Sequence, residues 1–289
     1  MSSPAQPPTT TASAFMAVVP PPLSGSSLWA SRYAGELRRI IHQHAQRAPR
    51  SLQEHLGPSE LGARCDRQVA GKLAGIPKTN HVADPWPSIR GTALHAWAAE
   101  AFDADNSRTT PRWITEQRVT PHPDHPGTAD LYDAKEHAVV DWKFLGDASM
   151  NKIRSADGPP QHYIVQLLLY GRGYRLAGLP VDRVVLAACP ATAASLDTMY
   201  CWERIHTPAD DELLDYVFKR TAYRKQWAAA LIAGTASLMD VPSDPDDSSC
   251  YFCEYFRPEA ATNGGVGGCP GTRNMNAHGN NESGMRITP

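Results

Sequence analysis

Residues 127–143 constrain the fold of this chain more than any other segment, because they predict two adjoining strands that carry charged side chains. Their second half, 138–144, is rich in β-branched and aromatic residues, as a central strand is. Asp141 and Lys143 are two residues apart on that strand and therefore share a face. Asp130 lies on the preceding strand. We expect the three side chains to meet in one place.

The charges in this segment stand in an apolar context, where unpaired charges are costly. An isolated Asp-x-Lys pair is more often a solvated pair on an edge strand, but this pair follows three apolar residues and encloses Trp142. Two close carboxylates are ligands that Mg²⁺ and Mn²⁺ prefer, and such an ion promotes phosphodiester hydrolysis. Lys143 can orient the attacking water, and the small residues 127–129 would let metal and substrate approach. The segment therefore predicts a site for metal-dependent phosphodiester cleavage.

The remaining sequence pattern predicts an α/β chain with one mixed sheet flanked by helices. Helical spacing covers 28–46, 58–75, 88–102, 163–177 and 208–232, and strand patterns cover 113–119, 128–132, 138–144, 181–188 and 198–204. The helix over 58–75 would carry Cys65, and the polar stretch 147–161 is typical of a mobile loop. The expected segments are a disordered leader over 1–28, a domain over 29–240, a Cys-rich segment over 241–270 and a disordered tail over 271–289.

Composition and charge limit the class of partner. The chain has 42% hydrophobic and 20% charged residues and a net charge of −2, so a nucleic-acid surface would have to be a local patch. No apolar run approaches the roughly 20 residues of a membrane span, and the leader lacks the basic start of a secretory signal. We therefore expect a soluble, cytoplasmic protein without a membrane partner.

Two groups of cations and one group of aromatic residues are candidates for contact with nucleic acid. Cations near the predicted site are Arg64, Arg67, Lys72, Arg90, Lys152 and Arg154. A second group, which is more typical of a solvated helix face, is Lys219, Arg220, Arg224 and Lys225. The aromatic candidates for base stacking are Trp113, Trp142 and Tyr163, although core packing is the better interpretation of Trp142.

Four short motifs, taken in order, resemble the PD-(D/E)XK nuclease superfamily. They are Gly91-Thr92-Ala93-Leu94-His95, Gly127-Thr128-Ala129-Asp130, Asp141-Trp142-Lys143 and Gln166-Leu167-Leu168-Leu169-Tyr170. The chain is most similar to the RecB-like branch, which includes CRISPR-associated iron–sulfur exonucleases and their phage relatives. The resemblance spans roughly residues 58–270 and implies a restriction-endonuclease-like core.

The resemblance also implies roles for individual residues. His95 would be a metal ligand, Asp130 and Asp141 the metal carboxylates, and Lys143 the catalytic lysine. Two further residues, Gln166 and Tyr170, would flank the site and either contact DNA or steady the lysine. Without the resemblance, a lone His on a helix is more often a core or surface residue, and Gln166 with Tyr170 could equally reflect ordinary helix amphipathicity. Glu116, on the strand before the metal site, could also approach it, but an exposed strand charge is the better interpretation.

The cysteines predict a second metal centre. In an intracellular chain of this size, a cysteine cluster indicates a metal before it indicates disulfides. The resemblance implies a 4Fe–4S cluster, which would staple the C-terminal segment to the first helices and would be held by Cys65, Cys250, Cys253 and Cys269. Zinc is the runner-up, because four thiolates satisfy its tetrahedral site equally well. Fifteen residues separate Cys253 from Cys269, a longer gap than the resemblance implies. Cys189 and Cys201 are expected to be buried apolar residues.

Two functions from different classes follow from these features. The first is a DNA exonuclease, dependent on Mg²⁺ or Mn²⁺, that acts on ends or single strands in recombination, repair or DNA processing. Recombination, repair or CRISPR adaptation proteins would be its candidate partners. The alternative is a non-catalytic iron–sulfur subunit that binds DNA or supports assembly. The intact set of Asp130, Asp141 and Lys143 favours the enzyme.

Overall fold

A computed structural model describes residues 28–47, 56–80, 84–262 and 267–274 of the chain, which divides into two units, 1–48 and 49–289. The first unit contributes α1 (Leu28–Gln46), a helix with the predicted bounds. Nearly all of the leader and most of the tail lie outside the described residues, although Gly271–Asn274 forms a short 3₁₀ helix, η6. No helix within the described ranges combines the length and apolar character needed to cross a membrane.

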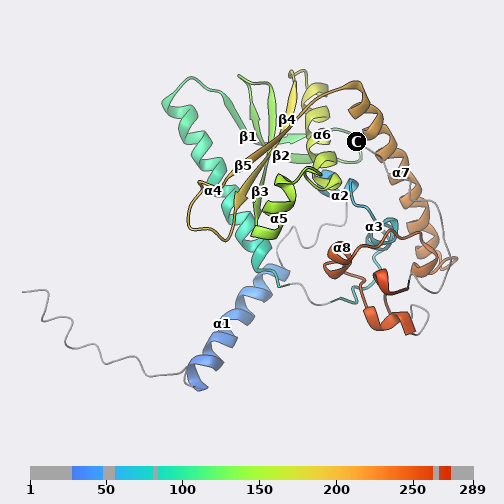
Figure 1. Cartoon of the computed structure of the whole chain (residues 1–289). Helices are drawn as coiled ribbons and strands as arrows, with labels where there is room; N and C mark the ends of the chain where they lie inside the picture. The colour runs from blue at the N-terminus through green and yellow to red at the C-terminus, as the bar shows by residue number, and fades with distance from the viewer. Residues whose placement is uncertain (1–27, 48–55, 81–83, 263–266, 275–289) are drawn as a thin grey trace, which may run out of the picture. The chain divides into compact units, whose positions relative to one another are not determined.

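The second unit is built on a five-stranded mixed sheet (Figure 1). Its strands lie in chain order as β1 (Trp113–Val119), β2 (Gly127–Asp133), β3 (Ala138–Leu145), β4 (Arg183–Pro190) and β5 (Tyr200–Ile205). Only β3 and β4 pair in parallel, and the other neighbours are antiparallel. A parallel pair needs a crossover connection, which here contains two helices. The mixed α/β class predicted from the sequence is confirmed.

The crossover corrects one prediction. The stretch 147–161, expected to be a loop, begins with the helix α5 (Asp147–Arg154). Met150 and Ile153 are buried on its inner side, and these two apolar residues, three apart, make α5 amphipathic despite its many polar residues. The second crossover helix, α6 (Gln161–Leu176), is mostly buried.

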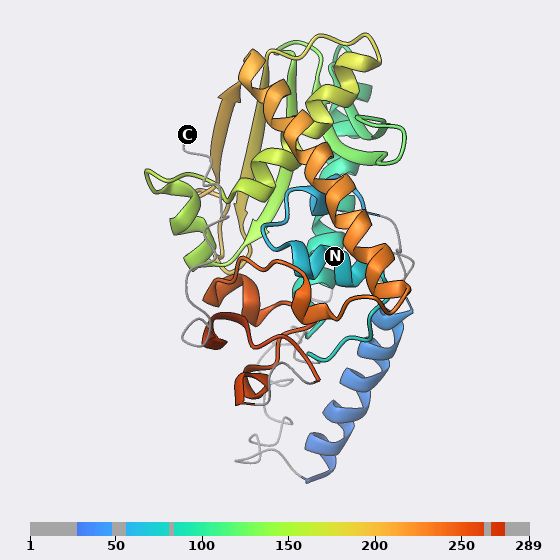
Figure 2. The same cartoon turned by 90° about the vertical axis from the view of Figure 1, so that its right-hand side faces the viewer.

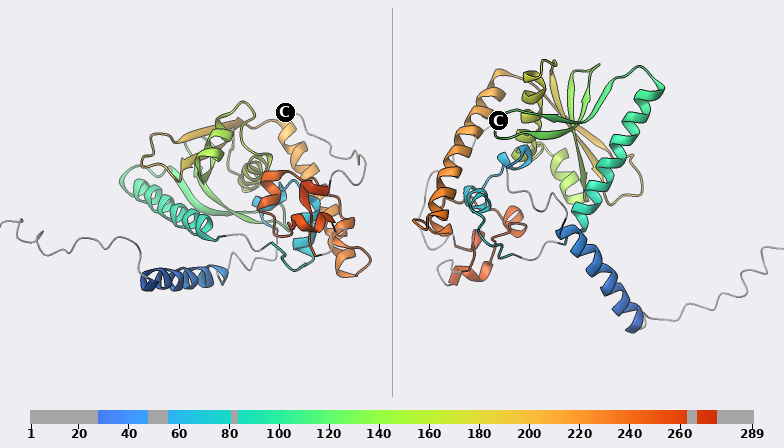
Figure 3. Two further views of the ribbon diagram at one scale, coloured as in Figure 1. Left: turned by 60° about the horizontal axis from the view of Figure 1, so that its bottom comes forward. Right: turned by 180° about the vertical axis from the view of Figure 1, so that it is seen from behind.

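The sheet lies between α4 (Trp86–Arg108) and α6, which cover its opposite faces (Figure 3, left). Phe102 of α4 packs on the rings of Trp113 and Trp142, with centroids 4.8 and 5.5 Å apart. Because side chains alternate along a strand, the neighbours of Trp142 on β3 point the other way, toward α6. The two faces of β3 are therefore both covered, and its charged residues lie on the α6 face.

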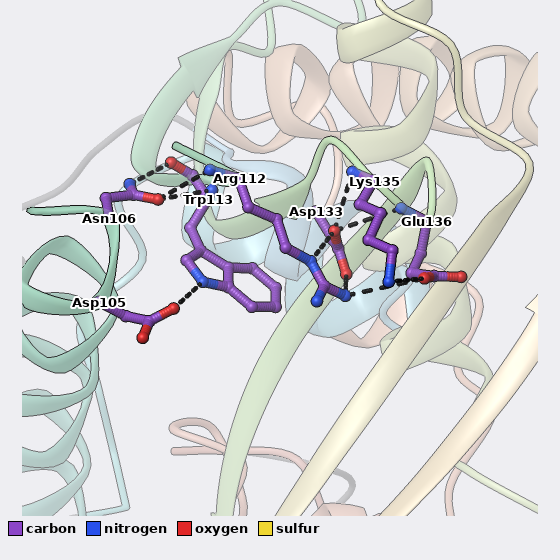
Figure 4. A network of polar contacts seen from close by, with 7 residues as sticks. All are labelled: Asp105, Asn106, Arg112, Trp113, Asp133, Lys135 and Glu136. Atoms are coloured by element: carbon purple, nitrogen blue, oxygen red, sulfur yellow. Dashed lines mark hydrogen bonds and ion pairs between the residues drawn. The ribbon is translucent and has the colours of Figure 1, made fainter. Parts of the chain in front are cut away.

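A polar network fixes the end of α4 to the first hairpin (Figure 4). The Arg112 side chain donates to Asp133 at 2.7 Å, and Asp105 accepts from the Trp113 indole at 2.9 Å. Asn106 caps the start of β1 by accepting from the backbone amides of Arg112 and Trp113. The bonds from Asp105 and Asn106 join α4 to β1, while the bond between Arg112 and Asp133 joins the start of β1 to the end of β2.

The helix expected over 58–75 is broken in two, α2 (Pro58–Leu61) and α3 (Asp66–Leu73). The break begins at Gly62, where a Cβ atom would lie 2.8 Å from the Cα of His162 on α6. Only a residue without a side chain allows this approach. Cys65 consequently lies at the N-cap of α3 and not inside a helix.

The long helix α7 (Pro208–Ile232) holds this broken segment in place. Arg224 is fully buried, donates to Asp66 at 2.6 Å and also bonds the carbonyl oxygen of Leu61. Arg220 donates to the same Asp66 carboxylate at 2.8 Å. The expectation of a solvated helix face is therefore wrong for Arg224, whose charge is used to fix the segment that carries Cys65.

After α7 the chain returns to α3. It forms the short helices η4 (Leu238–Asp240), α8 (Asp247–Tyr251) and η5 (Pro258–Thr262) before η6. Figure 2 shows this C-terminal segment, in orange and red, beside α3 and the end of α7. Arg67 of α3 joins the two parts through bonds to the carbonyl oxygens of Val241 and Met239, both at 3.0 Å.

Candidate functional site

The predicted site lies where two central strands separate. Pairing between β2 and β3 ends at Leu131 and Val140. Beyond that point the carboxylate of Asp130 replaces a strand partner by accepting the backbone N–H of Trp142 at 2.8 Å. The register of the two strands puts Asp130 and Asp141 on the same face of the sheet. The gap between the strands thus gathers acidic side chains at one point of the sheet.

Asp141 and Lys143 lie on the same face of β3, as the sequence predicts, and form a buried ion pair at this point. Asp141 is 1% exposed, and burial raises the pKa of its carboxyl to about 6, although the charge on Lys143 opposes the rise. Lys143 is less deeply buried and also lies over the ring of Tyr163, 5.0 Å from its centroid. Burying a charged carboxylate away from water costs folding free energy unless cations lie close to it.

Gln166 connects the members of this pair. Its side-chain nitrogen donates to Asp141 at 2.9 Å, and its oxygen accepts from Lys143 at 3.2 Å. The same nitrogen lies 3.2 Å from the hydroxyl of Tyr170, one turn further along α6. Both Gln166 and Tyr170 are buried. Of the two roles that the resemblance implies for them, steadying the lysine agrees with this burial better than contact with DNA.

A second acidic group lies beside the pair and contains His95, Asp130 and Glu116, whose ligand atoms lie within 4.8 Å of one another. His95 reaches from α4, with Nδ1 3.3 Å from Asp130. Burial lowers the pKa of His95, but the hydrogen bond with Asp130 and the negative charges of Asp130 and Asp141 together leave the pKa raised. The structure thus joins two of the three predicted metal ligands, while the oxygens of Asp141 are engaged by Lys143 and Gln166.

Glu116 is the member of this group that the sequence interpretation left out of the ligand set. It is exposed, as expected, but it lies opposite Asp130 in the β1–β2 hairpin and therefore reaches the site. Its backbone has φ = 47°, in the left-handed region that non-glycine residues rarely adopt. Such strain is concentrated at functional sites. The hairpin register, counted from the turn, is the sequence signal that could have found it.

We expect Glu116→Gln to weaken Mn²⁺ binding by at least about 10-fold, since even outer-shell partners of a metal contribute 10- to 100-fold. The amide keeps the size of the side chain and removes the charge that attracts the ion. Calorimetric titration of the purified protein with Mn²⁺ measures the effect. Glu203→Gln is the matched control, because Glu203 is an exposed glutamate on β5 that pairs with Arg183. Equal Mn²⁺ affinity in both variants would exclude Glu116 as a ligand.

Gly127, one of the small residues before Asp130, does not have the expected role of letting metal and substrate approach. A Cβ atom there would lie 2.6 Å from the ring of Pro58 and 3.2 Å from Tyr170. The absent side chain therefore makes room for α2 and α6 and does not open a path for metal or substrate.

The four cysteines of the predicted cluster line one pocket of about 420 Å³. Burial, and then the nearness of the other three cysteines, raises the pKa of the Cys253 thiol to about 12. Asn80 holds the turn between Cys250 and Cys253 by donating to the carbonyl oxygens of Tyr251 and Cys253, at 3.0 and 2.9 Å. The chain thus brings the N-terminal Cys65 to the three C-terminal cysteines.

The four cysteines could serve either of two kinds of metal centre, zinc or an iron–sulfur cluster. Among the described residues, no three of the four cysteines bring their sulfurs within 4.8 Å of one another. Tetrahedral zinc, with Zn–S bonds of about 2.3 Å, holds its sulfurs roughly 3.8 Å apart. A four-iron cluster is larger than one ion, so its thiolates stand further apart. Zinc would therefore require the sulfurs to move closer together, and four thiolates are a donor set that suits either centre.

Several other expectations about single residues need correction. Arg67 is buried and donates to the sulfur of Cys269 at 3.2 Å, so it does not face a phosphate. Arg64 is partly exposed but forms an ion pair with Asp244. Cys189 is buried as expected, but Cys201 is exposed, because β5 is an edge strand with one open side.

No protein-family model and no curated protein sequence matches this chain. Three solved structures are similar to part of it. An alkaline exonuclease from Laribacter hongkongensis, LHK-Exo, is 12% identical, with a TM-score of 0.42 over 63% of this chain and 91% of its own. Its complex with dAMP is 13% identical, with a TM-score of 0.43. A phage related exonuclease from Haemophilus somnus 129PT is 15% identical, with a TM-score of 0.37 over 59% of this chain and 82% of its own. Values this low do not assign the chain to a family, so its function has to be argued from its own residues.

Proposed function

We propose that this chain is a metal-dependent nuclease of the PD-(D/E)XK type that degrades DNA from its ends. The observation that carries the proposal is the buried pair of Asp141 and Lys143 beside the group of His95, Glu116 and Asp130, at the point where two strands separate. A sheet gains no stability from so many charges in one place. Their retention is explained if the charges act on a bound ion and a phosphate.

The residues that would hold the divalent ion are His95, Glu116, Asp130 and Asp141. Their oxygens suit Mg²⁺ and Mn²⁺ equally, and the imidazole nitrogen favours Mn²⁺. When bound, such an ion polarises the phosphoryl oxygen and lowers the pKa of water. The Asp130 carboxylate is already oriented for this task by the Trp142 amide and by His95.

Lys143 has a separate role in the proposed reaction. Asp141 and Gln166 fix its ammonium group on the α6 face of the sheet, where it can orient the attacking water and offset negative charge that develops on the phosphate. Gln166 positions both members of the pair, and Tyr170 in turn holds Gln166. Preorganised polar groups of this kind need no rearrangement during the reaction.

The cysteine pocket would hold a 4Fe–4S cluster through Cys65, Cys250, Cys253 and Cys269. Four cysteines around one pocket support a thiolate-held metal centre, and the resemblance to iron–sulfur exonucleases favours a cluster over zinc. The Arg67 guanidinium beside Cys269 would offset the negative charge of the thiolates. Cluster ligation would connect α3 to the C-terminal segment. The expected contribution is to stability, since hydrolysis of a phosphodiester involves no electron transfer.

A time course on end-labelled DNA tests the proposed activity. Purified protein is incubated with linear duplex, circular duplex and single-stranded DNA, in Mg²⁺ or in Mn²⁺. We expect linear or single-stranded substrates to shorten from their ends, circles to stay intact, and Mn²⁺ to give the faster cleavage. Cleavage of circular DNA would show that the protein is an endonuclease and that the proposed exonuclease activity is wrong. If the protein binds DNA but leaves it uncut with either metal, the proposed nuclease activity is wrong and the non-catalytic iron–sulfur subunit is the better proposal.

A further inference from the structure

The turn between β1 and β2 carries a second group of metal-ligating side chains, separate from the site above. Its sequence is Pro121-His122-Pro123-Asp124-His125-Pro126. The ligand atoms of His122, Asp124 and His125 lie within 4.8 Å of one another. The three prolines restrict the backbone, and the His125 N–H donates to the His122 carbonyl oxygen at 2.9 Å. The turn therefore presents three ligands at a low cost in conformational entropy.

His125 is already in the form that a metal ligand requires. It is 4% exposed, and its Nδ1 lies 3.0 Å from the carbonyl oxygen of Leu56. A carbonyl oxygen can only accept, so Nδ1 carries the proton and Nε2 keeps its lone pair. Metal-bound histidines generally donate their other ring N–H to a carbonyl or carboxylate in this way.

The other two ligands can adjust, because neither is deeply buried. The ring of His122 packs on Phe218 of α7, with centroids 4.8 Å apart, and its Nδ1 accepts a long hydrogen bond of 3.2 Å from the Asp124 amide. Coordination through either ring nitrogen of His122 would cost only this weak bond. Zinc holds nitrogen and oxygen ligands at about 2.0–2.2 Å and hence roughly 3.3 Å apart, so shifts of the His122 and Asp124 side chains would suffice.

A lysine side chain already lies beside this group. The ammonium of Lys225, also on α7, lies 2.9 Å from Asp124. Lys225 and Asp124 are both exposed, and a metal ion would compete with this ion pair in open solvent, where such pairs are weak. The Asp124 carboxylate thus already attracts a cation, and the Lys225 ammonium can move away when a metal ion binds.

We propose that His122, Asp124 and His125 form a binding site for a first-row transition metal ion of the Zn²⁺ class, with a fourth position open to water. Two imidazoles and one carboxylate are ligands that zinc takes. Binding would stiffen the β1–β2 turn and its contact with Leu56. The site is independent of the proposed nuclease activity and of the cysteine pocket.

Zinc titration of the full chain tests the proposal, with a chromophoric chelator as competitor and zinc content measured after dialysis. We expect His122→Ala and Asp124→Asn each to weaken one zinc site by at least about 10-fold, while zinc held elsewhere in the chain is unaffected. Lys225→Met should tighten the same site by about two- to fivefold, the range of an exposed charge interaction.

His137→Asn is the matched control, because His137 is an exposed histidine in the neighbouring β2–β3 turn and pairs with Asp182. The control should bind zinc like the unaltered chain. Equal zinc affinity and content in His122→Ala and the unaltered chain would overturn the proposal. An equal loss in His137→Asn would do the same, since it would show unspecific binding to surface histidines.

Discussion

Replacing Asp141 with asparagine is expected to reduce DNA cleavage by more than the roughly 100-fold that loss of an outer-shell partner of a metal can cost. The amide has the same size and keeps one oxygen toward Gln166, but it cannot neutralise Lys143 or attract a divalent ion. Initial cleavage rates on end-labelled linear DNA, measured at saturating Mn²⁺, test the change. Because burial already raises the pKa of Asp141 to about 6, a neutral group at this position should be tolerated by the fold.

The control for this variant is Asp133→Asn on β2. Asp133 is also a buried carboxylate of the sheet, but it pairs with Arg112 at the far end of the hairpin (Figure 4). Its replacement should lower thermal stability and leave the cleavage rate of the folded protein unchanged. Cleavage by Asp141→Asn at the rate of the unaltered chain, with normal folding by circular dichroism, would exclude Asp141 from the active site.

The strands and the long helix of the second unit were predictable because their signals are local. β3 alternates apolar and charged residues between two covered faces, and its β-branched residues suit a sheet. α7 begins with Pro208 after a capping box between Thr207 and Asp210, a signal contained in four consecutive residues. Local patterns of this kind also bring Asp141 and Lys143 to one face, which is why that pair was predictable.

What the sequence did not reveal depends on residues distant along the chain. Gly62, where the helix expected over 58–75 breaks, has no room for a side chain because α6 passes beside it. Arg224 looks like a surface charge until α3 and α7 meet around Asp66. Glu116 joins the site only through the register of the hairpin and a strained backbone. Such features arise from tertiary contacts, which override local propensity.

Replacing Cys253 with serine is expected to remove the proposed cluster, and with it the iron, the acid-labile sulfide and the visible absorbance of the purified protein. A hydroxyl is a poor substitute for a thiolate, the usual ligand of such clusters. The free energy of metal binding is also folding free energy, about 10 kcal/mol or more for structural zinc sites. We therefore expect the C-terminal segment from Val241 onward to become the first target of limited proteolysis in this variant.

Cys201→Ser is the matched control, because Cys201 is exposed on β5 and lies outside the pocket. It should keep the iron, the colour and the protease resistance of the unaltered chain. If the unaltered chain contains zinc in place of iron, the pocket remains a metal centre but the proposed iron–sulfur cluster is wrong. Unchanged iron content in Cys253→Ser would remove Cys253 from the ligand set. Protease resistance and DNA cleavage rate together distinguish the effects of the two variants. Loss of the cluster loosens the junction of α3 with the C-terminal segment, and so affects protease resistance. Loss of the Asp141 carboxylate acts at the gap between β2 and β3, and so affects the cleavage rate.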